Sequence, residues 1–194
     1  MSTSKVTVRR EAKIASIVAT AWELAEADGV AGLSLHALAR AVGLRQPSLY
    51  EYFDSKHALY DEMFADGNRQ LQAHLAALTL PREPRRALKR YLGALASFAL
   101  ERPARYELMF LRHLPNFTPS DASYAIAGEV LGTFVERMTA AGVTKPDDVD
   151  CLVAMTAGLI DAQLANEPNT DRWIRHLDRL IDLLVDDAIR RSAQ

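Results

Sequence analysis

The chain has 194 residues, of which 49% are hydrophobic, and this length is sufficient to bury the core of one fair-sized domain or of two smaller ones. Lys and Arg number 23 against 25 Asp and Glu, and the resulting net charge of −2 excludes a uniformly basic nucleic-acid-binding chain. The one cysteine, Cys151, excludes an internal disulfide, and its apolar neighbours predict a buried thiol.

Helical periodicity runs through most of the chain and predicts an all-α fold. Ala, Leu, Arg and Glu are frequent, whereas alternating runs of β-branched residues are nearly absent. The expected helices cover residues 9–27, 35–42, 46–53, 56–78, 85–100, 104–114, 120–140, 146–165 and 170–190. We expect an N-terminal three-helix region at residues 1–55, joined by the long helix that starts at residue 56 to a helical region at 56–194.

Two short helical segments follow the first long helix and are separated by a tight glycine turn. Ser34 is placed to cap the first segment, Gly43 ends it, and Pro47 fits the first turn of the second. This arrangement matches the helix-turn-helix pattern, whose second helix lies in the major groove of DNA. A helical projection puts Leu49 and Phe53 on one buried face and leaves small, polar and aromatic side chains facing outward.

The outward side chains suit docking against DNA. The amide of Gln46 can pair with an adenine edge and the guanidinium of Arg45 with a guanine edge, while Tyr50 and Tyr52 offer hydroxyls to phosphates. Lys56 puts a cation at the positive end of the next helix, a conflict that a bound phosphate would resolve. Three further cations are expected on an N-terminal arm: Arg9, Arg10 and Lys13. Similar short helix pairs also occur in proteins that never meet DNA, so the spacing alone leaves this function open.

The stretch GLSLHALARAVGLRQPSLYEYFDSKHALYDEMF, residues 32–64, resembles the DNA-binding region of the tetracycline-repressor-like (TetR/AcrR) transcription regulators. The matching positions are Leu33, Ser34, Leu38, Ala39, Val42, Gly43, Leu49, Tyr50, Phe53, Lys56 and Leu59. The resemblance implies phosphate contacts from Ser34, Tyr50 and Lys56. It assigns sequence reading to Arg45, Gln46, Pro47 and Ser48. It also implies an all-helical homodimer that represses transcription from operator DNA and releases that DNA when a small ligand binds.

The C-terminal region offers candidates for an apolar ligand site. They are Phe98, Tyr106, Met109, Phe110, His113, Tyr124, Phe134 and Met155. Core packing would explain any one of these residues alone. As a set they suggest the lining of a cavity, in which His113 or Tyr106 would provide a polar group that orients the ligand. The stretch FALERPARYELMF, residues 98–110, resembles a ligand-domain subgroup named for a Trp-His-Gly signature, of which only Gly158 is present.

Two C-terminal helices carry apolar stripes with spacings of three and four residues, the pattern of helix packing. The stripes are Leu152, Thr156, Leu159 and Gln163 in one helix, and Ile174, Leu177, Ile181, Leu184 and Ala188 in the other. We expect these stripes to form a two-fold homodimer interface. The alternative is that they close the core of the monomer.

Patterns for catalysis, cofactors and metals are missing from the sequence. None of the 5 histidines pairs with another at helical spacing or lies beside Cys151, and neither a nucleophile elbow nor a phosphate or dinucleotide loop occurs. We therefore expect a regulator rather than an enzyme. The N-terminal residues lack the apolar core of a signal peptide, and no apolar run is long enough to span a bilayer, so a cytoplasmic protein that does not contact membranes is expected. The alternatives are a helical-bundle ligand-binding protein or enzyme without DNA-binding activity, and a helical scaffold without a ligand.

Overall fold

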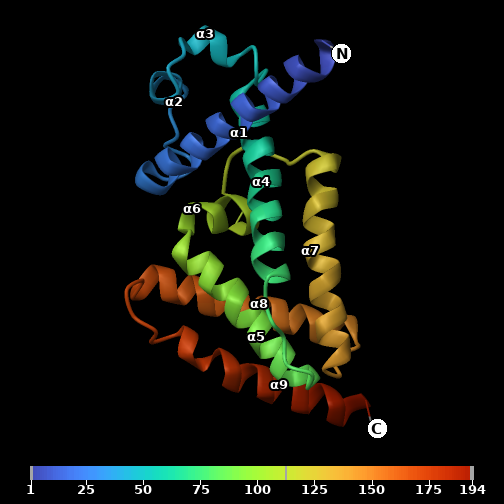
Figure 1. The fold of residues 1–194 in the computed structure, drawn as a ribbon. Coiled ribbons are helices and arrows are strands. Elements are labelled where there is room, and N and C mark those ends of the chain that lie inside the picture. The colour runs from blue at the N-terminus through green and yellow to red at the C-terminus, as the bar shows by residue number, and fades with distance from the viewer. Residues whose placement is uncertain (1, 112, 193–194) are drawn as a thin grey trace. The chain divides into compact units, whose positions relative to one another are not determined.

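The computed structural model describes the backbone of residues 2–111 and 113–192, with side chains from residue 7 onward. All regular structure in these residues is helical, which confirms the predicted all-α fold (Figure 1). The α-helices are α1 (Ser2–Asp28), α2 (Leu35–Ala41), α3 (Gln46–Leu49), α4 (Lys56–Ala76), α5 (Pro84–Glu101), α6 (Pro103–Tyr106), α7 (Asp121–Ala140), α8 (Pro146–Asn166) and α9 (Leu177–Ser192). A π-helical turn, η1 (Glu107–Leu111), follows α6, and a 3-10 turn, η2 (Ile174–His176), precedes α9.

The chain divides into two compact units. The first unit comprises Met1–Asn68 and Ala104–Ile126, and the second comprises Arg69–Pro103 and Ala127–Gln194. The boundaries fall inside α4 and α7 and after the first residue of α6, so each of these helices contributes residues to both units.

A buried tryptophan of α1 organises the first unit. Trp22 is 1% exposed, and its Nε1 donates a hydrogen bond to Asp66 of α4 at 2.8 Å. The guanidinium carbon of Arg105 in α6 lies 4.7 Å from the ring centroid, and the same guanidinium pairs with Glu26 of α1 at 2.9 Å. Glu26 also accepts a hydrogen bond from the backbone N–H of Ala104. These contacts bind α1, α4 and α6 together.

The core of the second unit is formed by α5, α8 and α9, which pack against one another. Most of the two stripes predicted to pair across a dimer are buried in this core within a single chain: Leu152, Thr156, Leu159, Gln163, Leu177, Ile181 and Ala188. The predicted seam is therefore wrong in its residues. A spacing of three and four residues marks a face that packs on another helix, but it does not say whether that helix belongs to the same chain. Cys151 is exposed, contrary to the predicted buried thiol.

Four predicted helices differ from the observed elements by more than two residues. The first begins at Ser2 instead of residue 9. The segment expected at 104–114 is the short α6 followed by η1, with residue 112 outside the described residues. The second helix of the helix-turn-helix is regular only from Gln46 to Leu49. The last helix starts at Leu177 instead of residue 170, because the preceding residues bind to α8.

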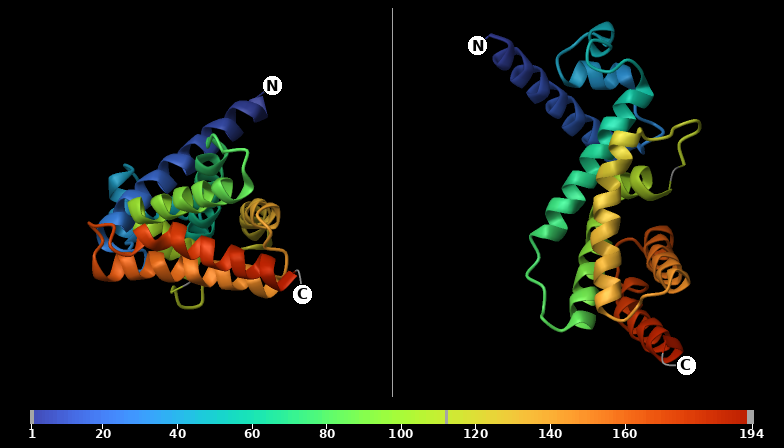
Figure 2. Two further views of the ribbon diagram at one scale, coloured as in Figure 1. Left: turned by 90° about the horizontal axis from the view of Figure 1, so that it is seen from below. Right: turned by 90° about the vertical axis from the view of Figure 1, so that its right-hand side faces the viewer.

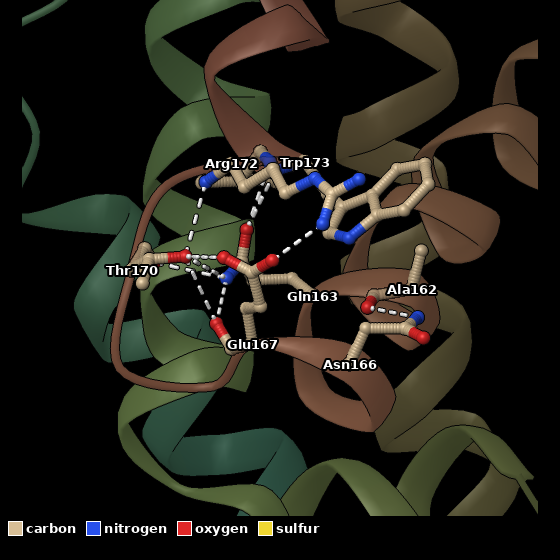
Figure 3. Close-up of polar contacts among 8 residues, drawn as sticks. Ala162, Gln163, Asn166, Glu167, Thr170, Arg172 and Trp173 are labelled. Carbon is tan, nitrogen blue, oxygen red and sulfur yellow. Dashed lines mark hydrogen bonds and ion pairs between the residues drawn. The ribbon is translucent and has the colours of Figure 1, made fainter.

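The connection between α8 and α9 is held by the buried side chain of Gln163 (Figure 3). Its Nε2 donates to the carbonyl oxygens of Glu167 and Thr170. Its Oε1 accepts hydrogen bonds from the backbone N–H groups of Trp173 and Ile174 at 2.9 and 3.1 Å. The amide oxygen thus provides an acceptor for two N–H groups that precede the first turn of α9, and the whole amide fixes the loop in an irregular conformation.

Replacing Gln163 with Leu should lower the free energy of unfolding by about 1–3 kcal/mol, because the part-buried N–H groups of Trp173 and Ile174 lose the acceptor that they share. The matched control is Asn166→Ala on the same helix, where the exposed amide bonds only to the carbonyl of Ala162. This control should change stability by less than about 0.5 kcal/mol. Urea unfolding of both variants tests the role of the amide, and equal losses at the two positions would contradict it.

Candidate nucleic-acid interface

The turn between α2 and α3 has the geometry that its sequence predicts. Ser34 caps α2, and its Oγ accepts a hydrogen bond from the backbone N–H of Ala37 at 3.3 Å. Gly43 has a φ of 70°, in the left-handed region that glycine adopts without a steric penalty. The N–H of Leu44 donates to the carbonyl of Ala39 at 2.8 Å and closes the turn. The predicted helix-turn-helix geometry is confirmed in these residues.

Helix α3 is anchored on one side and open on the other. Leu49 and Phe53 are buried, as the helical projection predicts, whereas Tyr50 is 46% exposed. The other predicted DNA contacts of this stretch are all accessible: Arg45 and Pro47 are exposed, and Gln46, Ser48 and Tyr52 are half-buried. The open side therefore combines hydrogen-bonding groups with small and aromatic side chains on a fixed support.

Lys56 begins α4 and has partners within the chain that the sequence did not reveal. Its Nζ donates to the carbonyl oxygen of Ala31 at 3.4 Å and lies 5.3 Å from the ring centroid of Tyr60. The helix itself is capped by Ser55, whose Oγ accepts a hydrogen bond from the N–H of Ala58 at 3.0 Å. The carbonyl and the aromatic face offset the repulsion between the ammonium group and the positive helix end.

The predicted N-terminal arm is wrong, because its basic residues lie on α1, which is a continuous helix (Figure 2). Two of these cations contact the helix-turn-helix itself. Lys13 donates from Nζ to the carbonyl oxygen of Val42 at 3.0 Å. Arg10 donates to the carbonyl oxygen of Glu51 at 2.9 Å, and its guanidinium carbon lies 5.4 Å from the ring centroid of Tyr52. The sequence contains one signal that Arg10 and Lys13 would contact the helix-turn-helix: they are three residues apart and so share one face of a helix.

The eight predicted ligand contacts are divided between the two units. Tyr106, Met109, Phe110, His113 and Tyr124 lie in the first unit, and Phe98, Phe134 and Met155 lie in the second. Packing within each unit accounts for several of them: Phe98 meets His74 with their rings 5.8 Å apart, and Phe134 stacks on Tyr91 at 6.3 Å. His113 is exposed, and Phe110 stacks on Tyr106 at 5.4 Å while 44% of it remains exposed.

Within residues 2–111 and 113–192, His, Cys, Asp and Glu do not form a group of three that could hold a metal ion. In the same residues, no helix has both the length and the apolar character needed to cross a membrane.

The helix-turn-helix falls inside a known family pattern. Residues 17–63 match the model of bacterial regulatory proteins of the tetR family. Residues 88–188 match a second model, a tetracycline-repressor-like C-terminal domain. The chain belongs to the TetR family. The first match includes the C-terminal part of α1, all of α2 and α3, and the start of α4. The second includes most of α5 through α9. Membership of the Trp-His-Gly subgroup stays a prediction.

The curated relatives are similar over part of the chain. The HTH-type transcriptional regulator YobS of Bacillus subtilis is 33% identical over 96 residues, which are 50% of this chain and 50% of YobS. The chain spans about half the length of the curated relatives it matches.

Two solved TetR-family structures share the fold over nearly the whole chain. BioQ, crystallised with its double-stranded DNA operator, has a TM-score of 0.62 at 20% identity, over 91% of this chain and 98% of that one. A TetR variant from Acinetobacter baumannii, crystallised with minocycline, has a TM-score of 0.60 at 20% identity, over 91% and 96% of the two chains.

Replacing Gly43 with Ala should lower the free energy of unfolding by about 1–2 kcal/mol, because an L residue is strained at this φ. The added Cβ would meet no atom within 4 Å, so the backbone alone carries the cost. Gly132 in α7 provides the matched control, since its added Cβ would also meet no atom within 4 Å but its backbone is helical. Gly132→Ala should raise stability by up to about 1 kcal/mol. Denaturant unfolding that gives both variants the same sign would refute the strained turn.

Proposed function

We propose that this chain is a DNA-binding transcriptional regulator that recognises operator DNA through α3. The observation that carries the proposal is the open side of the one-turn helix α3, which is anchored by buried Leu49 at its end and by buried Phe53 just beyond it. Membership of a family of bacterial regulatory proteins supports it. We further propose residues 1–55 as the DNA-binding region and residues 56–194 as the ligand-binding and dimerisation region, in a cytoplasmic protein without catalytic function.

Within this proposal, the side chains divide into two roles. Ser34, Tyr50, Tyr52 and Lys56 contact phosphates and set the position of the protein on the duplex. Arg45 and Gln46 read base edges, because a guanidinium and an amide can each form two hydrogen bonds with one base. Pro47 and Ser48 directly follow Gln46 and are small enough to allow a close approach to the groove.

Substitution of Lys56 and Gln46 should separate the two roles. Lys56→Ala should weaken binding about equally across DNA sequences and lower the salt slope by roughly 1, because one phosphate contact is lost. Gln46→Ala should relax the preference at one or two base positions and cost about 1–3 kcal/mol on the preferred sequence. Operators selected from random duplex DNA provide the substrate, and fluorescence anisotropy at several salt concentrations gives the affinities.

The matched control for Lys56→Ala is Arg86→Ala, which removes an exposed cation from the second unit. This variant should leave both the affinity and the salt slope unchanged. If Lys56→Ala behaved like the control, with its thermal unfolding unchanged, the proposed docking would be wrong.

We also propose a homodimer through the outer faces of α8 and α9. Val153 of α8 is 41% exposed, and Leu183 and Ile189 of α9 are 57% and 46% exposed, whereas the faces that these helices pack on α5 and on each other are buried. A Cβ added to Gly158 of α8 would meet no atom within 4 Å, so this helix surface is open to a second backbone. A two-fold pairing would present two recognition helices to half-sites about one helical turn of DNA, or a small multiple, apart.

Leu183→Arg should weaken the dimer by roughly a hundredfold or more, because a buried unpaired charge costs about 3–5 kcal/mol. Leu131→Arg in α7 is the matched control, since Leu131 is 54% exposed on a helix outside the proposed interface. Sedimentation at micromolar concentration should show monomers for the first variant and dimers for the second. Dimers for Leu183→Arg and monomers for Leu131→Arg would instead indicate that the interface lies on α7.

A small apolar effector completes the proposed function. In the first unit, Tyr106 and Met109 are buried aromatic and methionine side chains, which are the residue types that line apolar ligand sites. Tyr124 of the same unit is half-buried and extends the set. An effector held by such residues would act by favouring a conformation with lower affinity for operator DNA. Operator DNA would in turn lower the affinity of the protein for the effector by the same factor.

A further inference from the structure

We propose that Arg10 and Lys13 of α1 are positioning residues that fix α3 against α2 and thereby determine how well bases are read. The inference rests on the proposed function, because base reading requires operator DNA. Both cations contact carbonyl groups of the helix-turn-helix. Their effect on DNA recognition would be indirect, through the angle at which α3 is presented.

Lys13 stabilises the end of α2. The structure places its half-buried ammonium 3.0 Å from the carbonyl oxygen of Val42, which is the C-cap residue of that helix. Carbonyl groups at a helix C-terminus lack partners in their own helix and carry the negative end of its dipole. A cation at this point therefore satisfies an acceptor and fixes the first residue of the turn that leads into α3.

Arg10 holds the residues that follow α3. It donates to the carbonyl oxygen of Glu51 and lies against the ring of Tyr52, so one side chain contacts two successive residues beyond the helix. The start of α3 has no comparable support, because Arg45 at its N-cap forms no capping hydrogen bond through its side chain. Helix α1 therefore fixes the recognition helix α3 at its C-terminal end.

Helix α3 needs such support because of its length. A segment of 4 residues is a single turn, and an isolated turn is unstable in water, since nucleation fixes several dihedral angles for one hydrogen bond. Buried Leu49 and Phe53 fix the depth of the segment in the core. Two hydrogen bonds from one face of α1 also restrict the rotation of α3. One goes to a carbonyl that precedes α3 and the other to a carbonyl that follows it.

The test compares Lys13→Met and Arg10→Met with the unaltered chain, because Met keeps an unbranched stem but removes the donors and the charge. Each variant should bind its selected operator roughly tenfold more weakly, which is the loss expected for one charged hydrogen bond. Binding to random duplex DNA should stay within about twofold, and the salt slope on that DNA should stay constant, because phosphate contacts are retained. Lys13→Arg should restore operator binding, since a guanidinium can donate to the same carbonyl.

Arg9→Met serves as the matched control, because Arg9 is an exposed cation on the same helix. It should leave the ratio of operator affinity to random-DNA affinity unchanged. A salt slope that falls by about 1 in Lys13→Met or Arg10→Met, with equal losses on both kinds of DNA, would overturn the inference in favour of direct phosphate contacts. An unchanged ratio in both variants would also overturn it. If the unaltered chain selected no duplex sequence, the proposed function would itself fail, and this inference with it.

Discussion

The contact between the ring of Trp22 and the guanidinium of Arg105 is the interaction on which the first unit depends. The guanidinium is buried, and it is tolerated there because Glu26 neutralises it and the indole face attracts it. The indole N–H is in turn satisfied by Asp66. Each polar group of this cluster has a partner on another helix, so the position of α1 is fixed relative to α4 and α6.

A fixed α1 matters because the two short helices of the candidate interface have little stability of their own. Helix α2 has 7 residues and α3 has 4, lengths at which packing rather than intrinsic propensity holds a helix together. Both take their orientation from buried anchors and from the cations of α1. The side chains proposed to read DNA are therefore supported by a rigid helix that needs no contact with DNA.

In the second unit, α8 and α9 each carry apolar residues on more than one face, so packing within the chain covers only part of their apolar surface. The faces that pack on α5 and on each other are covered, while Leu183 and Val153 remain exposed. Polar contacts define the two ends of this pair: Gln163 binds the loop at one end, and Arg191 pairs with buried Asp148 at the other. The hydrogen bond that Arg191 donates to Asp148 raises the pKa of Arg191, which keeps the guanidinium charged beside a buried carboxylate.

The sequence by itself determined the helical fold, the cap at Ser34 and the turn at Gly43, because each of these depends on residues within one or two helical turns. The open side of α3 also followed from the spacing of Leu49 and Phe53. Only the tertiary structure decided which apolar face of α9 is covered, and which carbonyl groups Arg10 and Lys13 bind. Those carbonyls lie 41 and 29 residues further along the chain, and a local pattern shows that a side chain is charged or apolar without showing which distant segment it will meet.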